Sequence, residues 1–443
     1  MTVNNSQNRP IAIDLFAGAG GMTLGFEMAG FDVPVSVELD PIHCATHQFN
    51  FPFWSVLCRS VAEVTAEEIR RVGNLGDRQI DVIFGGPPCQ GFSQMGKRSI
   101  GDPRNELMLH FARLVEELQP KYFVIENVKG LTVGRHREVL DKVQKKMENC
   151  GYEILLPYKV LNAANYGVPQ SRERLFLLGC QKGLEMPRYP EAITDNPKKK
   201  YAKSSRKKKK ISNTNILPNA PTVKEAIADL PQIEKYPELL KQDWVKVEYG
   251  EPSDYAKKMR GLAFSEDDYS YDRLYDRTIL TGCSRTKHSQ SSKDRFAATP
   301  PGKNEPISRF HKLHGEGISN TLRAGTPSNR GAHTSPRPIH FDRPRCITLR
   351  EAARLHSYPD WFRFHGTKWH GFRQIGNSVP PLLASSIATE VIRVLDCQPS
   401  KPEAKQSLGE ESRLKLNISE AANLYGVERN VIEPRKRGEK SDR

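Results

Sequence analysis

Over the first 180 residues, short apolar runs of strand length recur along the chain, and amphipathic helical patterns separate several of them. This alternation predicts an α/β fold with a mostly parallel, doubly wound sheet. The expected strands are Ile11–Phe16, Val33–Leu39, Ile80–Phe84, Tyr122–Ile125, Glu153–Val160 and Leu175–Leu178. The expected helices are Met22–Ala29, a short helix from the capping box Thr65–Glu68 to Val72, Glu106–Leu118, and Glu138–Cys150.

Glycine-rich and polar segments stand at the carboxyl ends of several expected strands. Ligands of doubly wound sheets bind beyond these ends, so the segments should converge in one crevice. A glycine loop follows the first strand, and Glu38 ends the second. The later segments are Gly85-Gly-Pro-Pro-Cys-Gln90, Glu126-Asn127 and Gln170-Ser-Arg-Glu-Arg174, of which the last immediately precedes the final strand.

The glycine loop, Phe16-Ala-Gly-Ala-Gly-Gly21, allows the backbone to approach a ligand closely. Glu38 follows Gly18 by 20 positions, a spacing at which a carboxylate can bind the two hydroxyls of a ribose. Thr23 stands where the dinucleotide fingerprint requires its third glycine, which disfavours a dinucleotide. A single nucleoside such as S-adenosylmethionine, or a tight turn without a ligand, remains open at this point.

Cys89 and Glu126 are candidates for a nucleophile and an acid. Cys89 follows two glycines and two prolines, a rigid loop that suits an aimed thiolate better than a packing residue. Glu126 ends an apolar strand, where an unpaired carboxyl would have a raised pKa and could donate a proton. Arg172 and Arg174 could supply positive partners. The alternatives are an inert thiol, a structural carboxylate and a basic surface cluster.

Charge and composition point to a nucleic-acid partner. The chain has 443 residues, which suggests two to three domains, and a formal net charge of +15. Residues 1–175 carry a net charge of −1, so the remainder carries +16, from 48 basic and 32 acidic residues. A basic soluble surface is the alternative. The eight cysteines form no C-x-x-C pair, and no apolar run reaches transmembrane length, so we expect a reducing cytoplasm and no membrane partner.

Six ordered motifs resemble those of the DNA (cytosine-5)-methyltransferases, in particular those of bacterial type II restriction-modification systems. Four of them lie within residues 11–180 and two within residues 345–395. The motifs are Ile13-Asp-Leu-Phe-Ala-Gly-Ala-Gly-Gly21, Gly86-Pro-Pro-Cys-Gln-Gly-Phe-Ser93, Glu126-Asn-Val128, Gln170-Ser-Arg-Glu-Arg174, Thr348-Leu-Arg-Glu-Ala-Ala-Arg-Leu-His-Ser-Tyr-Pro-Asp360 and Gln374-Ile-Gly-Asn-Ser-Val-Pro380.

The resemblance implies a methyl transfer from S-adenosylmethionine to carbon 5 of cytosine in duplex DNA. The Cys89 thiolate would add to carbon 6, while Glu126 holds and protonates ring nitrogen 3. Arg174 would orient Glu126 and the carbonyl of the base, and Arg172 would support the adduct or a nearby phosphate. The target must flip out of the helix, because it cannot react within the base stack.

The resemblance also implies a Rossmann-like cofactor site. Phe16 should face the adenine, Gly18 and Gly20 the methionine part, and Glu38 the ribose, while Asn377 and Ser378 close the methionine end. The other expected cofactor contacts are Asp14, Ala17, Gly21, Leu39 and Pro87. Ser60 stands where the family usually has an aspartate for the adenine amino group, so we expect adenine recognition here to be weaker or to use other groups. No metal is expected, because His311 and His314 lack a third ligand.

The expected domains follow from the motif positions. Residues 1–182, completed by residues 370–398, form the catalytic and cofactor-binding domain, and residues 183–369 form a smaller, irregular target-recognition domain. A helix from the capping box Thr222–Glu225 should stop near Pro231. The segment between Gly179 and Thr348 is called here the insert. Within it, Lys198–Lys210 holds nine basic residues and could contact phosphates or be a solvated run. Asn320–Arg337 could contact the DNA backbone and bases. Residues 399–443 form a basic tail with a helix near Ile418.

Three other functions compete with this interpretation. An RNA cytosine methyltransferase would use the same chemistry, but the long basic insert favours duplex DNA. A nicotinamide-dependent oxidoreductase is disfavoured by the broken fingerprint, and a DNA-binding regulator on an inactive scaffold by the intact Cys89, Glu126 and Arg174. We expect a monomeric, cytoplasmic bacterial enzyme that protects DNA from a cognate restriction endonuclease.

Overall fold

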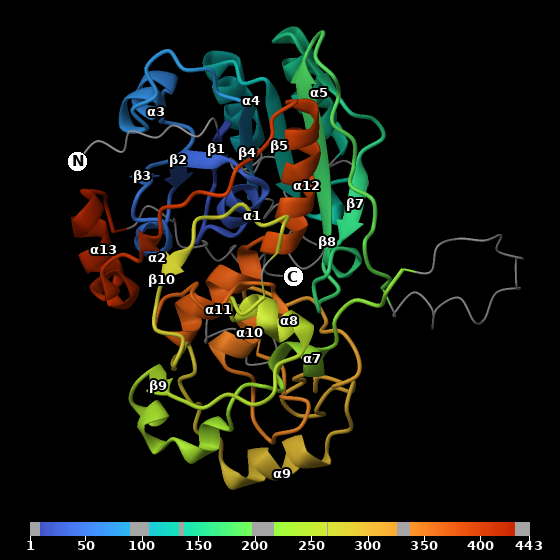
Figure 1. Ribbon diagram of the computed structural model, residues 1–443, viewed down its shortest axis with the longest axis vertical. Coiled ribbons are helices and arrows are strands. Elements are labelled where there is room, and N and C mark those ends of the chain that lie inside the picture. Colours follow the sequence, from blue (N-terminus) through green and yellow to red (C-terminus); the bar gives the residue numbers. More distant parts are fainter. Residues whose placement is uncertain are drawn as a thin grey trace, which may run out of the picture.

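The centre of the molecule is one eight-stranded sheet. The computed structural model describes residues 9–88, 106–132, 137–196, 217–263, 265–325 and 337–429. The strand order is β3–β2–β1–β4–β5–β8–β6, and β7 pairs with β8 (Figure 1). The strands are β1 (Ile11–Leu15), β2 (Asp32–Glu38), β3 (Ser55–Cys58), β4 (Val82–Gly85), β5 (Tyr122–Asn127), β6 (Tyr152–Ile154), β7 (Lys159–Asn162) and β8 (Glu173–Gln181).

The first five strands run parallel to one another, and the other three enter by antiparallel pairing. β2 and β4 flank β1, β3 lies beyond β2, and β5 lies beyond β4. β8 is antiparallel to β5, β6 and β7. The predicted mostly parallel, doubly wound sheet is therefore confirmed. Its antiparallel part consists of β6, β7 and β8, which come last along the chain.

Helices cover both faces of the sheet, because alternate residues of each strand point to opposite sides. Ala12 of β1 belongs to the core under α1 and α12, whereas Ile13 belongs to the core under α3, α4 and α5. The helices are α1 (Gly21–Ala29), α2 (Pro41–Asn50), α3 (Ala66–Val72), α4 (Leu107–Leu118), α5 (Arg137–Asn149) and α12 (Pro381–Val394), with 3-10 turns at Lys129–Thr132 and Ala163–Asn165.

Helix α12 returns from the end of the chain to pack on α1 (Figure 1). The contact requires a glycine, since a Cβ on Gly25 would lie 2.4 Å from the Cβ of Ala384. Residues near position 384 therefore contribute to the helical layer on one face of the sheet.

Three elements differ from the expectation. Strand β3 (Ser55–Cys58) was not among the expected strands. The strand expected over residues 153–160 is two short strands, β6 and β7, which pair with different parts of β8 on either side of a bend at Leu155–Tyr158. Helix α2 was not expected at all. It begins at Asp40, whose side chain accepts a hydrogen bond from Ile42 N, and Pro41 occupies its first position.

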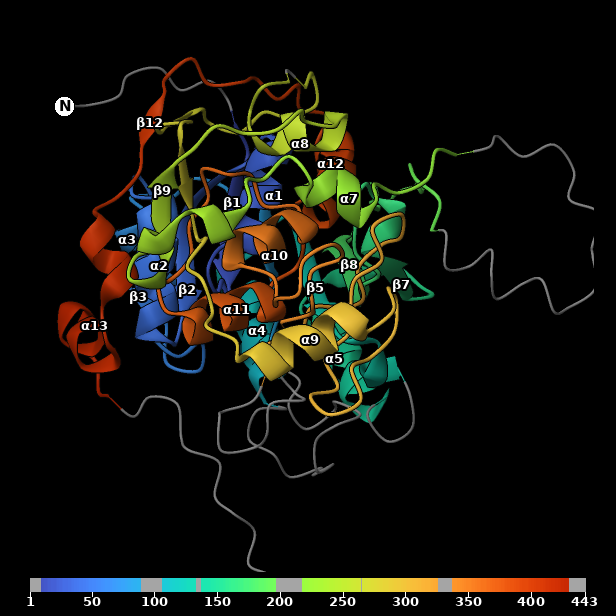
Figure 2. The same cartoon turned by 90° about the horizontal axis from the view of Figure 1, so that it is seen from below.

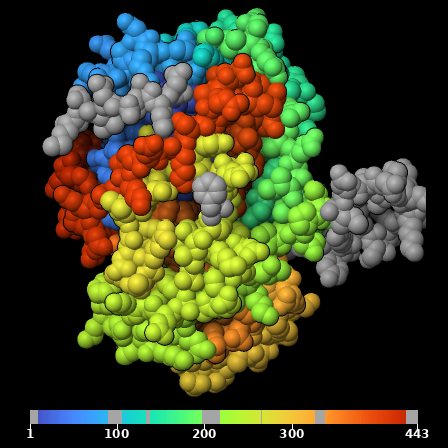
Figure 3. Space-filling model, viewed as in Figure 1, coloured from blue at the N-terminus to red at the C-terminus, as the bar shows by residue number. Residues whose placement is uncertain are grey.

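The insert forms the lower part of the molecule, and α10 and α11 lie at its junction with the sheet (Figures 1 and 3). Regular structure is sparse there, as expected. The capping boxes at Thr222 and Thr348 are both present. The elements are α7 (Val223–Ile227), α8 (Asp254–Met259), α9 (Gln290–Ala298), α10 (Leu349–Leu355), α11 (Lys368–Asn377), β9 (Trp244–Lys246), β10 (Arg273–Leu274), β11 (Ile279–Thr281) and 3-10 turns at Ile233–Lys235 and Pro237–Leu240.

The segment after α12 is folded onto the first domain as far as residue 429. β12 (Gln406–Ser407) pairs with β10, and a 3-10 turn (Glu411–Lys415) and α13 (Ile418–Tyr425) follow. The expected helix near Ile418 is confirmed. The segment lies against α2, because Gly409 N donates to Phe49 O at 2.8 Å and the Tyr425 hydroxyl to Gln48 at 2.9 Å.

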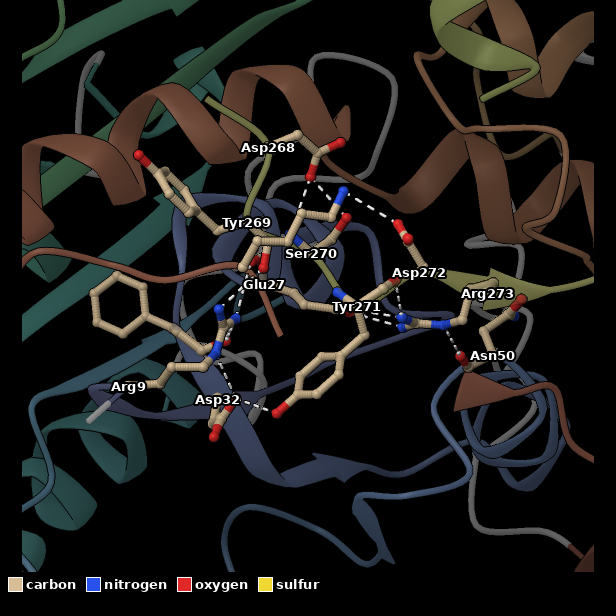
Figure 4. A network of polar contacts seen from close by, with 12 residues as sticks. Arg9, Glu27, Asp32, Asn50, Asp268, Tyr269, Ser270, Tyr271, Asp272 and Arg273 are labelled. Carbon is tan, nitrogen blue, oxygen red and sulfur yellow. Dashed lines mark hydrogen bonds and ion pairs between the residues drawn. The ribbon is translucent and has the colours of Figure 1, made fainter. Parts of the chain in front are cut away.

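A buried ion pair joins the insert to helix α1, which covers one face of the sheet (Figure 4). Both guanidinium Nη atoms of Arg273 donate to the two carboxylate oxygens of Glu27 at 2.8 Å, and both side chains are 0% exposed. Tyr271 N also donates to Glu27, and Tyr271 Oη to Asp32. Because Glu27 lies on α1, this contact ties the insert to the helix that follows the glycine loop.

Candidate active site

The loops after β1 and β4 meet at the point where the strand order reverses. β1 lies between β2 and β4 in the sheet, and this switch point is where ligands of doubly wound folds bind. A Cβ on Gly85 would lie 2.0 Å from Leu15 O, so the ends of the two strands approach closely. The residues expected at the carboxyl ends are thus brought to one edge of the sheet.

The glycine loop has a backbone that requires glycine and leaves open space beside it. Gly18 and Gly20 have φ of 57° and 100°, and a Cβ on Gly20 would lie 2.4 Å from the ring of Phe51. A Cβ on Gly18 would meet no atom within 4 Å. Phe16 has φ 67°, and Ala17 is buried with its N–H donating to Val37 O. The space beside Gly18 is where a ligand can approach the loop.

Glu38 is held beside this loop by two backbone groups. Its Oε2 accepts a hydrogen bond from Gly18 N and its Oε1 from Asp40 N, both at 2.8 Å. The carboxylate keeps the further acceptor capacity that a ribose diol needs. Leu39 and Ser60 are half-buried, and Ser60 Oγ accepts from Ala62 N at 3.3 Å.

Asp14 lies beneath the loop and contacts α1. It is 1% exposed, and its Oδ2 accepts a hydrogen bond from Thr23 Oγ1 at 2.5 Å, while His47 Nε2 lies 3.1 Å from the same hydroxyl. Burial raises the pKa of Asp14 well above its usual range and lowers that of His47 to about 3. Its carboxylate has almost no surface to offer a ligand, so any effect of Asp14 on a cofactor passes through α1.

The end of α11 covers the start of α1. A Cβ on Gly21 would lie 3.0 Å from the Cβ of Ser378 and 2.6 Å from Val379 O. Asn377 is exposed at the end of α11, and Ser378 is half-buried. The last motif therefore reaches the glycine loop, although more than 350 residues separate the two along the chain.

Glu126 and Arg174 form a buried ion pair across neighbouring strands. Glu126 lies near the end of β5, and Arg174 lies at the start of antiparallel β8. Arg174 Nε is 2.7 Å from Glu126 Oε1. Burial raises the pKa of Glu126, and the positive charges of Arg174 and Arg172 partly offset this effect. The carboxyl is thus paired, unlike the unpaired one considered from the sequence, yet its pKa is still raised.

The loop after β4 passes directly over Glu126. A Cβ on Gly86 would lie 2.8 Å from Glu126 Oε2, so a side chain there would displace the Glu126 carboxylate. Asn127 Nδ2 donates to the carbonyl of buried Pro87 at 3.2 Å. Cys89 lies outside the described residues, as do Lys198–Lys210 and residues 326–336 of the expected DNA-contacting segment.

Arg172 has different partners from those expected. It is 0% exposed, and its Nη atoms donate to the carbonyl oxygens of Leu322, Gly376 and Ser378 at 2.7–2.8 Å. Burial also lowers its pKa well below the ordinary value for arginine. These contacts leave no surface for a phosphate, so Arg172 instead holds the insert and the last motif against the catalytic strands.

Sequence reasoning missed a second connection between the same segments. Gln170 Nε2 donates to Leu355 O at 3.1 Å, and Gln170 Oε1 accepts from Leu322 N at 3.0 Å. His356 Nδ1 lies 3.0 Å from Gln170 Nε2. Gln170 and His356 belong to two different motifs, and nothing in the sequence indicates that they contact each other.

Neither a metal cluster nor a membrane-spanning helix occurs in the part of the chain that the structure describes. No three His, Cys, Asp or Glu side chains gather there as metal ligands, and His311 Nδ1 lies 2.9 Å from Asn304 Oδ1. The described helices are too short or too polar to cross a bilayer.

Comparisons with known proteins agree on one family. The model of the C-5 cytosine-specific DNA methylase family matches residues 11–393. The chain is 52% identical to the type II methyltransferase M.XorII of Xanthomonas oryzae pv. oryzae, over 97% of this chain and 95% of that protein. It is 32% identical to the type II methyltransferase M.DdeI of Desulfomicrobium norvegicum, over 86% and 88% of the two chains.

A solved structure supports the same assignment. A crystal structure of a candidate DNA modification methyltransferase encoded within an Escherichia coli prophage is 33% identical. It superposes with a TM-score of 0.68 over 87% of this chain and 99% of that one. The resemblance inferred from six motifs is therefore confirmed. The chain belongs to the C-5 cytosine-specific DNA methylase family and is a DNA cytosine methyltransferase.

Proposed function

We propose that this enzyme methylates carbon 5 of a cytosine flipped out of a specific duplex DNA sequence, with S-adenosylmethionine as methyl donor. The observation that carries the proposal is the Glu126–Arg174 pair, buried under Gly86 at the edge of the sheet where the glycine loop opens. A carboxyl with a raised pKa beside a rigid glycine–proline loop suits an acid placed next to a nucleophile.

The residues present fit the methyl donor. The open space beside Gly18 accommodates an approaching ligand, and the Glu38 carboxylate can accept hydrogen bonds from a ribose. We propose Phe16, Ala17, Gly20, Gly21, Leu39, Pro87, Asn377 and Ser378 as further contacts, with Asp14 acting through Thr23. When bound, S-adenosylmethionine supplies an electrophilic sulfonium methyl group.

The chain's own groups then activate the cytosine. The Cys89 thiolate forms a bond to carbon 6, and the Glu126 carboxyl gives its proton to nitrogen 3, so that the adduct is an enamine rather than a carbanion. Carbon 5 forms a bond to the methyl group, whose bond to the sulfonium sulfur breaks and leaves the neutral thioether S-adenosylhomocysteine, and carbon 5 then loses its proton to a base. Cys89 then leaves as a thiolate, nitrogen 3 returns its proton to Glu126, and the 5–6 double bond is restored.

The biological role proposed here is modification of DNA in a restriction-modification system. Relatives named as type II methyltransferases and the excess of basic residues after position 175 support it. The proposal includes a cognate endonuclease, a monomeric cytoplasmic enzyme, a catalytic domain of residues 1–182 and 370–398, and a recognition domain of residues 183–369.

The chemistry can be tested with duplex DNA that carries 5-fluorocytosine. Fluorine cannot leave carbon 5 as a cation, so an adduct that has accepted the methyl group cannot eliminate. We expect the unaltered enzyme to form a protein–DNA complex that survives denaturation, and Cys89→Ser to bind the same DNA without forming it. Methyl transfer by Cys89→Ser would contradict the mechanism.

A further inference from the structure

Basic side chains gather where the start of α11 meets the segment that leads into α9. The group consists of His288, Lys293, Arg337 and Lys368, called here the α11 cationic cluster. Lys368 Nζ donates to Arg285 O at 2.6 Å, which holds its chain at the segment that leads into α9. His288 is fixed by accepting a hydrogen bond from Cys346 N and by an edge-on contact with Phe296.

The cluster concentrates positive charge. Partial burial lowers the pKa of His288, and the charges that lower it further are those of Arg337, Lys368, Lys293 and Arg345. Partial burial and then Arg337 lower the pKa of Lys368. Arg345 is already paired, with Glu351 and Glu234 at 2.7 Å. Repulsion between neighbouring positive charges raises the free energy of the cluster, and an anion that binds among them offsets this repulsion.

The cluster is open to a large ligand. Lys293 is exposed on α9, and Arg337 and Lys368 are half-buried. Lysine and arginine side chains that gather at a solvent-exposed surface are suited to binding nucleic acid.

Helix α11 connects this cluster to the active site. Its ten residues give it a length of about 15 Å. At its far end, Gly376 O accepts from Arg172, and Ser378 lies against Gly21. The recognition insert crosses the same end, since a Cβ on Gly376 would lie 2.2 Å from Ala324 N. The cluster is thus about 15 Å from the cofactor loop.

We propose that the α11 cationic cluster binds backbone phosphates of the substrate duplex and so sets the position of the DNA relative to the active site. Contacts to phosphates fix register without reading sequence. This inference rests on the proposed function, because it presupposes duplex DNA as substrate.

The test compares Lys368→Gln and Lys293→Gln with Lys145→Gln, which removes an exposed charge from α5 in the upper part of Figure 1. We expect each cluster variant to weaken DNA binding about 3- to 10-fold and to reduce the slope of log affinity against log salt by about 0.9. The methylated sequence, the KM for S-adenosylmethionine and the kcat at saturating DNA should not change. Lys368→Arg should restore binding.

A duplex with single methylphosphonate linkages locates the contact. In a series of duplexes that each carry one neutral linkage at a different distance from the target, we expect one position to weaken binding by the unaltered enzyme without weakening binding by Lys368→Gln any further. Unchanged salt slopes, an equal loss in Lys145→Gln, or a changed methylated sequence would overturn the inference. If the unaltered enzyme itself binds no duplex, the proposed function fails rather than the cluster assignment alone.

Discussion

At the scale of single residues, the environment of Glu126 decides what the site can do. Burial favours the neutral carboxyl, and the guanidinium of Arg174 at 2.7 Å favours the carboxylate. The balance keeps the pKa above the usual range for glutamate, so the group can hold a proton until the base needs it.

This balance predicts a pH dependence. Only protonated Glu126 can give a proton to nitrogen 3, so we expect kcat to fall as the pH rises through the pKa of Glu126. Arg174→Gln removes a positive charge that lowers this pKa. The falling limb of the pH profile should therefore move to higher pH, alongside a loss of rate. A profile that moves to lower pH would contradict this role for Arg174.

Replacing the acid itself gives a second prediction. Glu126→Gln cannot supply a proton, and we expect kcat to fall about 10²- to 10⁴-fold while the variant still binds duplex DNA. Initial rates and DNA affinity measured on the same preparation check this. A kcat within threefold of the unaltered enzyme would contradict the assignment of Glu126 as the acid.

The sequence indicated Glu126 and Arg174 through their motifs, but it could not indicate the role of Arg172. Two arginines separated by one residue at the start of a strand look equivalent in the sequence. The fold separates them, because Arg174 reaches Glu126 while Arg172 lies 0% exposed among carbonyl oxygens of the insert and the last motif. The sequence also did not indicate the contact between Thr23 and His47, because His47 lies on helix α2, which was not predicted.

At the scale of elements, the packing of α1 against α12 holds the glycine loop and the returning chain together. The two helices touch at Gly25 and Ala384, where no room remains for an added methyl group.

We therefore expect Gly25→Ala to destabilise the protein by about 1–3 kcal/mol through overpacking. The companion change Ala384→Gly should recover part of this loss, because it removes the shortest of three close approaches, while Pro381 O and Ser385 N remain 2.7 and 2.8 Å from the new Cβ. Urea unfolding of the two single variants and the double variant measures the effect. A double variant no more stable than Gly25→Ala would contradict direct contact between these positions.

Alternation and capping signals predicted most elements of the first domain. Strands β1, β2, β4 and β5 lie within two residues of their expected places, whereas β3 was not predicted. Outside this domain, the capping boxes at Thr222 and Thr348 are also formed. Residues 153–160 show the limit of this reasoning. Apolar periodicity cannot indicate that both ends of such a run pair with one long partner strand, and a bend then divides it.

At the scale of the whole molecule, the insert is fixed to the catalytic domain from two sides. Arg172 donates a hydrogen bond to the carbonyl oxygen of Leu322, and Glu27 forms an ion pair with Arg273. Neither contact could be inferred from the sequence, because each joins segments more than 140 residues apart whose charges look like ordinary surface charges.

The pair in Figure 4 gives a prediction at this scale. Glu27→Leu leaves a buried guanidinium without its carboxylate and should cost about 3–5 kcal/mol of unfolding free energy. Glu27→Leu combined with Arg273→Met should cost less than Glu27→Leu alone. Lys224→Ala, which breaks an exposed pair with Glu316, is the control and should change little. Equal losses in Glu27→Leu and Lys224→Ala would contradict the importance of the buried contact.

The central claim is that this chain methylates cytosine at carbon 5 within a defined DNA sequence. The most direct measurement is transfer of a labelled methyl group from S-adenosylmethionine to unmethylated genomic DNA, followed by bisulfite sequencing of the product. We predict incorporation confined to cytosines in one short sequence motif, and none with Cys89→Ser. A folded, DNA-binding enzyme that incorporates no label, or that methylates RNA instead, would contradict the claim.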